Sequence, residues 1–292
     1  MEREKTRRKV KLNIFNTPTY VVSLKERSDR WKRFIQQPAI HLLKRLKQSR
    51  AVNGKTLDPK NDSRISVRTR LNIFRNYRRS HYEIATLGAV GCSLSHIDIW
   101  NKFLKSGSKY CLILEDDAIL TESVLHEINK VIPSLPKQWG IWILGNYTPN
   151  LIYQHLNTKP WNRIYNFTAS HAYLINRETA KLLLESAYPV ESHVDHYINA
   201  ISVLKNIMVL QHPSVHVEFF KKEHIQETPA RTVDSNTSQH KKKGCPTCKI
   251  NDDFSQIYVS PSRKTKQGML VKGLTKGMQT KEIRTLKKKP QR

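Results

Sequence analysis

Apolar stretches that suit strands alternate along this chain with stretches that suit amphipathic helices. Short apolar runs predict strands at 20–24, 110–114, 141–144, 172–175 and 207–210. Helical patterns fall between them, near 28–35, 88–104, 123–132, 178–187 and 193–204. Within 88–104, Val90, Leu94 and Ile97 follow the i, i+4, i+7 spacing of one helix face. The alternation predicts an α/β fold with a largely parallel sheet and helices on its faces.

Two parts of the chain lack such a pattern. Residues 41–80 are dense in Arg and Lys with scattered apolar residues, and we assign no element there. After about Phe220 the periodicity fades and polar and basic residues dominate, which favours disorder. We therefore expect a basic N-terminal tail over 1–15, one domain over 16–220 and a basic, flexible C-terminal tail over 221–292.

The charge of the chain is unevenly distributed. Lys and Arg total 51 against 24 Asp and Glu, a net charge of +27. Residues 25–80 carry 17 basic and four acidic side chains, and residues 221–292 carry 18 and six. The block over 81–220 carries 10 and 12 and is nearly neutral. Basic segments of this kind suit an anionic surface or nucleic acid, and they equally suit a merely solvated surface.

Cysteine usage and hydropathy bound the class of protein. Four cysteines in 292 residues do not make a disulfide scaffold, and Cys92 and Cys111 lie in apolar runs that suit a core. Cys245 and Cys248 form half of a zinc site, with His240 as a third ligand at most. We see no signal peptide and no stretch long enough to span a membrane, so we expect a cytoplasmic protein.

Three consecutive acids follow the apolar run that ends at Leu114. Glu115, Asp116 and Asp117 would lie at the carboxyl edge of a sheet, where open α/β folds bind ligands. The three carboxylates repel one another unless a cation joins them, and a divalent metal is the simplest candidate. Glu115 and Asp117 are two residues apart, so an extended backbone would point both to one side. An acidic turn or helix start is the alternative interpretation.

Several motifs, in order, resemble those of glycosyltransferase family 25, which includes lipooligosaccharide and procollagen galactosyltransferases. They are Val22-Ser23-Leu24 with Arg27 and Asp29-Arg30-Trp31, Ala51 to Lys55, Gly88 to His96 with Trp100, Leu114 to Asp117, Ala172 to Ile175, and Val194-Asp195. The resemblance implies a GT-A type, Rossmann-like fold, a nucleotide-sugar donor and usually Mn²⁺ (or Mg²⁺). Asn53 stands where the family usually has an acid, so a contact from that side chain is not carried over.

The resemblance also suggests roles for individual residues. The metal would be held by Glu115, Asp116 and Asp117, and the donor would be bound by Ser23, Arg27, Arg30, Gly91, Ser95, His96 and Asn146. Asp195 and His196 are candidates for the general base that an inverting transfer needs, with helix-surface polarity as the alternative. The expected reaction moves a hexose, galactose or glucose, from a UDP-sugar to a hydroxyl of a glycan or protein.

A different class of function remains open. The basic segments could serve a protein that binds nucleic acid or an anionic surface and that is built on a degenerate transferase-like domain. Nucleic-acid binding would need aromatic side chains on a basic face, and Phe74 and Tyr77 beside arginines are only a hint of one. The intact acidic motif at 115–117 argues for the enzyme.

Overall fold

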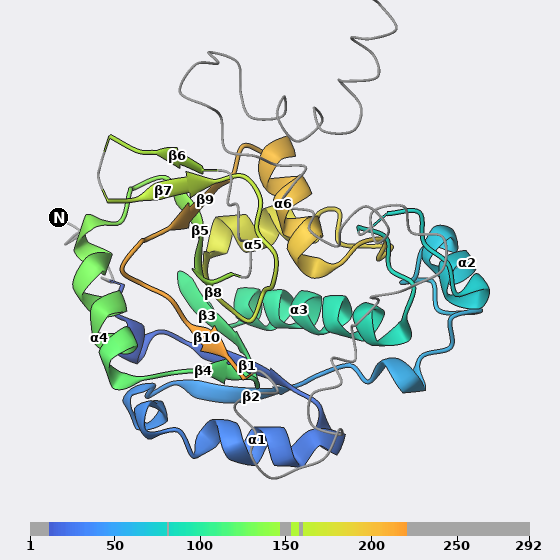
Figure 1. Ribbon diagram of the computed structural model, residues 1–292, viewed down its shortest axis with the longest axis horizontal. Coiled ribbons are helices and arrows are strands. Elements are labelled where there is room, and N and C mark those ends of the chain that lie inside the picture. Colours follow the sequence, from blue (N-terminus) through green and yellow to red (C-terminus); the bar gives the residue numbers. More distant parts are fainter. Residues whose placement is uncertain (1–11, 81, 147–152, 158–159, 221–292) are drawn as a thin grey trace, which may run out of the picture.

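The computed structural model describes residues 12–80, 82–146, 153–157 and 160–220 (Figure 1). The tail expected over 221–292, most of the tail expected over 1–15 and the Cys245–Cys248 pair lie outside the described residues. The domain limits set from the sequence therefore stay predictions.

An eight-stranded sheet forms the centre of the described part. Its strands, in spatial order, are β2 (Leu46–Arg50), β1 (Thr19–Ser23), β3 (Tyr110–Glu115), β8 (Ala172–Asn176), β5 (Trp139–Gly145), β9 (Met208–Gln211), β7 (Asn162–Ile164) and β6 (Tyr153–His155). The pairings give β7 and β8 one direction and the other six strands the opposite one. The α/β class and the mostly parallel sheet predicted from the sequence are confirmed.

Helices cover both faces of this sheet (Figure 1). The helices are α1 (Ser28–Ile35), α2 (Val67–Arg75), α3 (Leu87–Lys105), α4 (Glu122–Val131), α5 (Arg177–Leu184) and α6 (Val194–Leu204). In β3, Cys111 and Ile113 pack in the core beneath α3, α5 and α6, whereas Leu112 and Leu114 pack in the core beneath α1 and α4. The continuous apolar run of β3 reflects burial on both faces.

The elements that the sequence did not predict have weak patterns of their own. In β2 only Ser49 is buried, and the strand is defined by its parallel pairing with β1. In α2 the buried residues are Thr69 and Asn72, so the helix lacks an inward apolar stripe. The two-stranded sheet of β4 (Ala118–Ile119) and β10 (Glu218–Phe219) joins segments far apart in sequence. Within the described ranges, no helix has the length and apolar character needed to cross a membrane.

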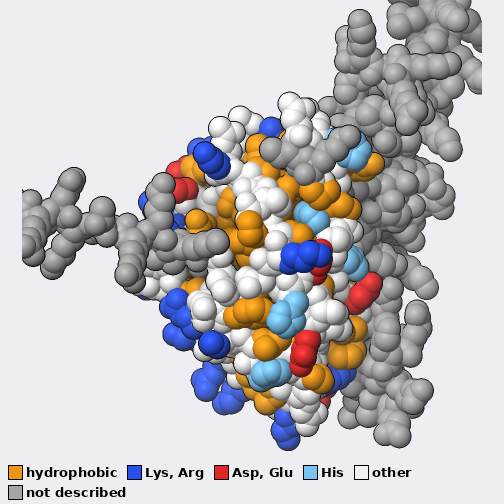
Figure 2. All heavy atoms as spheres, turned by 90° about the vertical axis from the view of Figure 1, so that its left-hand side faces the viewer, with side chains coloured by type: hydrophobic (Ala, Val, Ile, Leu, Met, Phe, Trp, Pro, Cys, Tyr) orange, Lys and Arg blue, Asp and Glu red, His pale blue; other side chains and the backbone are white. Residues whose placement is uncertain are grey.

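The surface on the side of α4 has a mixed character (Figure 2). Lys and Arg side chains gather toward one edge of this face, and His and acidic side chains are interspersed with apolar ones elsewhere. The positive charge is therefore not spread evenly over the described part of the molecule.

Three strand ends meet at one edge of the sheet. Val22, near the end of β1, pairs in register with Glu115, the last residue of β3. Because β8 runs antiparallel to β3, its start lies beside the end of β3, and the Glu115 N–H donates to the His171 carbonyl. The backbone thus places the acidic run next to a segment from much later in the chain.

Candidate functional site

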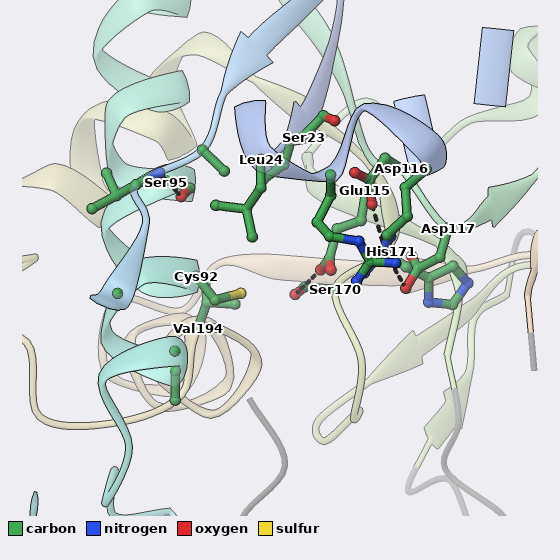
Figure 3. A pocket seen from close by; sticks show the side chains of 18 of the residues that line it. Ser23, Leu24, Cys92, Ser95, Glu115, Asp116, Asp117, Ser170, His171 and Val194 are labelled. Carbon is green, nitrogen blue, oxygen red and sulfur yellow. Dashed lines mark hydrogen bonds and ion pairs between the residues drawn. The ribbon is translucent and has the colours of Figure 1, made fainter. Parts of the chain in front are cut away.

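A cavity of about 590 Å³ opens at this edge of the sheet (Figure 3). Its walls come from the ends of β1 and β3, the start of α1, the segment 51–55, the N-terminal turns of α3 and α6, and the segments 169–171 and 219–220. Of the residues predicted from the sequence, the cavity is lined by Ser23, Arg27, Arg30, Ser95, Glu115, Asp116, Asp117 and Asp195. The structure does not bring Gly91, His96, Asn146 or His196 to the cavity wall.

Arg30 from α1 lies between two of the three acids. Its Nη2 atom is 2.5 Å from Asp116 Oδ1 and 2.8 Å from Asp117 Oδ2. Burial raises the pKa of Asp116 to about 6, although Arg30 and the Ser23 hydroxyl act in the opposite direction. Burial and the Glu115 charge also raise the pKa of Asp117, and Arg30 opposes them. One cation therefore only partly compensates the two carboxylates.

Glu115 points to a different set of partners. The Ser170 hydroxyl donates to Glu115 Oε1 at 3.1 Å, and His96 Nε2 lies 3.5 Å from the same oxygen. Burial raises the pKa of Glu115, but His96, with smaller contributions from His171 and Arg30, outweighs it and brings the pKa to about 2. The strand ends at Glu115, so the expected alternation does not continue. Glu115 and Asp117 both line the cavity, but Asp117 pairs with Arg30, whereas Glu115 contacts Ser170 and His96.

His96 belongs to a buried chain of hydrogen bonds behind the cavity. Trp100 Nε1–H can only donate, and it donates to the Tyr173 oxygen at 3.0 Å. We assign the Tyr173 O–H as donor to His96 Nδ1 at 2.9 Å, which leaves the ring proton on Nε2, facing Glu115. His96 is fully buried, so direct donor binding by its side chain, as predicted from the sequence, is not what the structure supports.

This assignment also bears on a possible metal cluster. Ligand-type atoms of Cys92, His96 and Glu115 lie within 4.8 Å of one another. A His96 Nε2 that carries a proton cannot ligate a metal, and burial raises the pKa of the Cys92 thiol well above its usual range. The three residues are therefore better described as the support that fixes Glu115.

His171 is the functional candidate that the sequence reasoning missed. Its Nε2–H donates to the Val217 carbonyl at 2.8 Å, so Nδ1 keeps a free lone pair. Within the described residues, His171 Nδ1 and Asp117 Oδ1 are both buried without a hydrogen-bond partner. Figure 3 shows the His171 ring beside the Asp117 carboxylate. A nitrogen and a carboxylate oxygen of this kind suit a divalent cation.

A glycine makes room for this histidine. A Cβ atom on Gly145, the last residue of β5, would lie 2.1 Å from His171 Nε2 and 2.4 Å from the Val217 carbonyl oxygen. His171 directly precedes the strand predicted at 172–175, but the sequence did not reveal that this strand runs antiparallel. Without that direction, the start of β8 could not be placed beside the acids.

Gly91 and Ser95 hold α3 against the segment over 51–54. A Cβ on Gly91 would meet the Val52 carbonyl oxygen at 2.5 Å. The Ser95 hydroxyl accepts from the Val52 N–H at 2.8 Å and donates to the Gly91 carbonyl at 2.6 Å. Both residues thus position the backbone of the cavity wall. Asn146 follows β5, outside the residues that line the cavity.

Asp195 lines the cavity from the first turn of α6. Its carboxylate accepts from the Ala169 N–H at 2.9 Å and from the His196 N–H at 2.8 Å. Burial raises its pKa, but His196, His193 and these N–H groups outweigh burial and lower it. The His196 ring packs edge-on against Tyr82, so His196 supports Asp195 and does not face the cavity.

Cationic side chains dominate the wall nearest α1. The cavity is lined by Arg27, Arg30, Arg33 and Lys55. Arg27 forms a bidentate pair with Asp29, and the Arg33 guanidinium lies 4.4 Å from the centre of the Phe220 ring. A cavity lined by both acids and cations suits a ligand that carries phosphate and binds with a metal ion.

Comparisons with known proteins point to one family. The profile described as glycosyltransferase family 25 (LPS biosynthesis protein) matches residues 16–198, more than half of the chain. A protein of Acanthamoeba polyphaga mimivirus, assigned as glycosyltransferase R655, is 26% identical over 132 residues, covering 44% of this chain and 37% of that protein. Procollagen galactosyltransferase 1 of Danio rerio is 25% identical over 134 residues, covering 43% of this chain and 21% of that protein.

These alignments span well under half of either relative. Among solved structures, a Bacillus anthracis protein assigned as a glucose-1-phosphate thymidylyltransferase, in complex with sucrose, matches with a TM-score of 0.32 and 9% identity. That match covers 68% of this chain and 69% of the other, and at this TM-score it carries no argument.

Proposed function

Because the chain belongs to glycosyltransferase family 25, we propose that it transfers a hexose from a UDP-sugar to a hydroxyl group of a glycan or protein, with inversion and with a divalent metal. The observation that carries the proposal is the pair of buried, unpartnered ligand atoms among the described residues, Asp117 Oδ1 and His171 Nδ1, beside two further acids. Galactose and glucose are the sugars that we expect.

The acids and His171 that line the cavity fit a divalent cation. Asp117 and His171 would hold it, with Asp116 as a further ligand once Arg30 moves toward the donor. When bound, such a cation acts as a Lewis acid that neutralises the departing diphosphate. Mn²⁺ suits the mixed oxygen and nitrogen ligands, and Mg²⁺ is the alternative.

The cationic side chains that line the cavity would bind the donor. Arg27, Arg33 and Lys55 can pair with phosphate oxygens or with the uracil side of the nucleotide. Glu115, held by Ser170 and His96, stays ionised and can accept hydrogen bonds from sugar hydroxyls. These contacts would orient the donor before transfer.

The acceptor would enter on the wall formed by α6. Asp195 is kept ionised there, and its two backbone N–H partners fix its orientation. In our proposal it takes the proton from the acceptor hydroxyl as that oxygen attacks the anomeric carbon and the bond to the diphosphate breaks. His196 contributes by holding Asp195 through its backbone N–H.

A donor-hydrolysis screen tests this function. We expect the protein to release UDP from one UDP-hexose in the presence of Mn²⁺, with little release in excess EDTA. Asp117→Asn should abolish release because it removes a charged ligand, whereas Asp58→Asn, on an exposed loop, should act like the wild type. Failure to release UDP from any UDP-sugar, or equal release in EDTA, would contradict the proposal.

A further inference from the structure

Helix α2 differs from an ordinary surface helix, which packs on its domain through apolar side chains. It packs on the domain through polar side chains: the Thr69 hydroxyl donates to the Val190 carbonyl at 3.1 Å, and the Asn72 amide donates to Ile84 O and Glu83 Oε2, each at 3.2 Å. Thr69 and Asn72 are the buried residues of the helix. Of the apolar side chains of α2, Ile73 is partly buried and packs against the core, so the helix is held by these polar contacts and Ile73.

The other apolar side chains of α2 point to solvent. Val67 is 70% exposed, Leu71 is 44% exposed and Phe74 is 54% exposed. Their i, i+4, i+7 spacing puts them in one stripe along the helix, and Tyr77, also exposed, follows just after its end. Contiguous exposed apolar patches rimmed by polar residues mark interaction sites on proteins or membranes.

The charge around the stripe is strongly positive. Between Asp62 and Glu83 the chain has no acid, and it has six arginines: Arg64, Arg68, Arg70, Arg75, Arg78 and Arg79. Of these, Arg78 is buried. Asp62 pairs with Arg64, and Glu83 pairs with Arg79 at 2.7 Å and with Arg68 at a longer 3.8 Å. Counting both acids, the segment 62–83 keeps a net charge of +4, from six arginines and two acids.

We propose that this face, defined by Val67, Leu71, Phe74 and Tyr77 with Arg68 and Arg75, docks on an anionic lipid bilayer surface. An apolar stripe of aliphatic and aromatic side chains with flanking arginines can insert among acyl chains while the guanidinium groups meet lipid phosphates. A nucleic acid would satisfy the arginines but would offer nothing to Val67 and Leu71.

The other occupants fit less well. The segment 221–292 carries 18 basic and six acidic residues, so its charge repels this face. The exposed apolar pair Val203 and Leu204 at the end of α6 consists of two adjacent residues, so it does not extend along a helix face as the α2 stripe does. The face in Figure 2, on the side of α4, shows apolar side chains interspersed with polar ones, not arranged as a stripe.

The position of α2 would place the cavity near the membrane surface. Figure 1 shows α2 at one side of the molecule, next to the start of α3. Leu87, the first residue of α3, lines the cavity. The docking proposal stands on α2 alone and does not depend on the reaction proposed above.

Vesicle co-sedimentation of the full chain tests the proposal. The vesicles are phosphatidylcholine with or without phosphatidylglycerol, at low and at high salt. The basic segments elsewhere in the chain add vesicle binding that salt weakens. The apolar stripe should therefore account for the vesicle binding that remains at high salt. We expect the wild type to bind only vesicles with phosphatidylglycerol, and Leu71→Ser with Phe74→Ser to lower the high-salt partition coefficient roughly tenfold or more.

The matched control is Val203→Ser with Leu204→Ser, which removes apolar groups that are more exposed than Leu71 and Phe74 and should leave binding unchanged. Arg68→Gln with Arg75→Gln should weaken binding mainly at low salt. Circular dichroism checks that each variant is folded. The proposal is overturned if the Leu71 and Phe74 variant binds vesicles like the wild type, or if the control variant loses as much vesicle binding. It is also overturned if the Leu71 and Phe74 variant loses self-association or duplex DNA binding while its vesicle binding persists.

Discussion

At the scale of single residues, the candidate site depends on side chains that never face the cavity. Tyr173 joins Trp100 to His96, and His96 in turn faces Glu115. All three supporting side chains are fully buried. Their hydrogen bonds have one consistent direction, so the position of Glu115 is set from behind by groups that exchange nothing with substrate.

Removing the Tyr173 hydroxyl should therefore affect both stability and catalysis. In Tyr173→Phe the Trp100 N–H and His96 Nδ1 lose a buried partner, which should cost about 1–3 kcal/mol of unfolding free energy. We expect kcat for UDP release to fall while KM changes little, because Glu115 remains present but less well oriented. Urea unfolding and steady-state kinetics measure the two effects. The control is Tyr197→Phe, because the Tyr197 hydroxyl donates to the Leu183 carbonyl and takes no part in the hydrogen bonds from Trp100 to His96. Equal loss of kcat in both variants would refute the role of these hydrogen bonds.

The acid cluster predicts a specific dependence on pH. The pKa of Asp116 is raised from 3.8 to about 6, so the folded state binds more protons than the unfolded state between these values. The contribution of Asp116 to stability without metal is therefore fully present below pH 3.8 and is lost as the pH rises through about 6. Mn²⁺ needs the ionised carboxylate, so its stabilising effect should grow over the same range.

Thermal unfolding with and without Mn²⁺ tests this sign. The increase in Tm on adding Mn²⁺ should be clearly larger near pH 7.5 than near pH 5. In Asp116→Asn the difference between the two pH values should shrink. A Mn²⁺ effect that is equal at both, or larger in acid, would show that the raised pKa of Asp116 has no part in metal binding.

At the scale of elements, close backbone contacts position the cavity wall. Gly91 of α3 packs against the segment over 51–54, which lines the cavity. Gly91→Ala should push α3 away from Val52, at a cost of about 1–3 kcal/mol, and should raise KM for the donor. Gly107→Ala is the matched change, because Gly107 has φ +72° with no atom near its Cβ. It should cost about 1–2 kcal/mol and leave KM unaltered; similar KM values in both variants would contradict this role of Gly91.

The sequence predicted the elements whose patterns are self-contained. The run at 110–114 lies in β3, and the stripe of Val90, Leu94 and Ile97 lies in α3. Both could be predicted because burial against a sheet selects apolar residues in a pattern that the sequence shows. It could not predict β2 or α2, whose burial follows from neighbours in space. For the same reason the acids were found, whereas His171 was not: its proximity to Asp117 depends on the direction of β8.

At the scale of the whole molecule, the site extends beyond the segment that matches the family. That match ends at residue 198, yet the Val217 carbonyl holds His171, and the Phe220 N–H donates to the Asp117 carbonyl. The pairing of β10 with β4 brings these residues back to the acid cluster. The C-terminal part of the described chain therefore completes the candidate metal site.

The most direct test of the account is a Mn²⁺ titration that measures affinity without turnover, for example from the electron paramagnetic resonance signal of the free ion. We predict that Asp117→Asn and His171→Gln each weaken Mn²⁺ binding by at least about tenfold. Asp195→Asn should bind Mn²⁺ like the wild type while losing sugar transfer. If Asp117→Asn and His171→Gln bound Mn²⁺ as tightly as the wild type, the central claim, that these two residues hold the catalytic metal, would be contradicted.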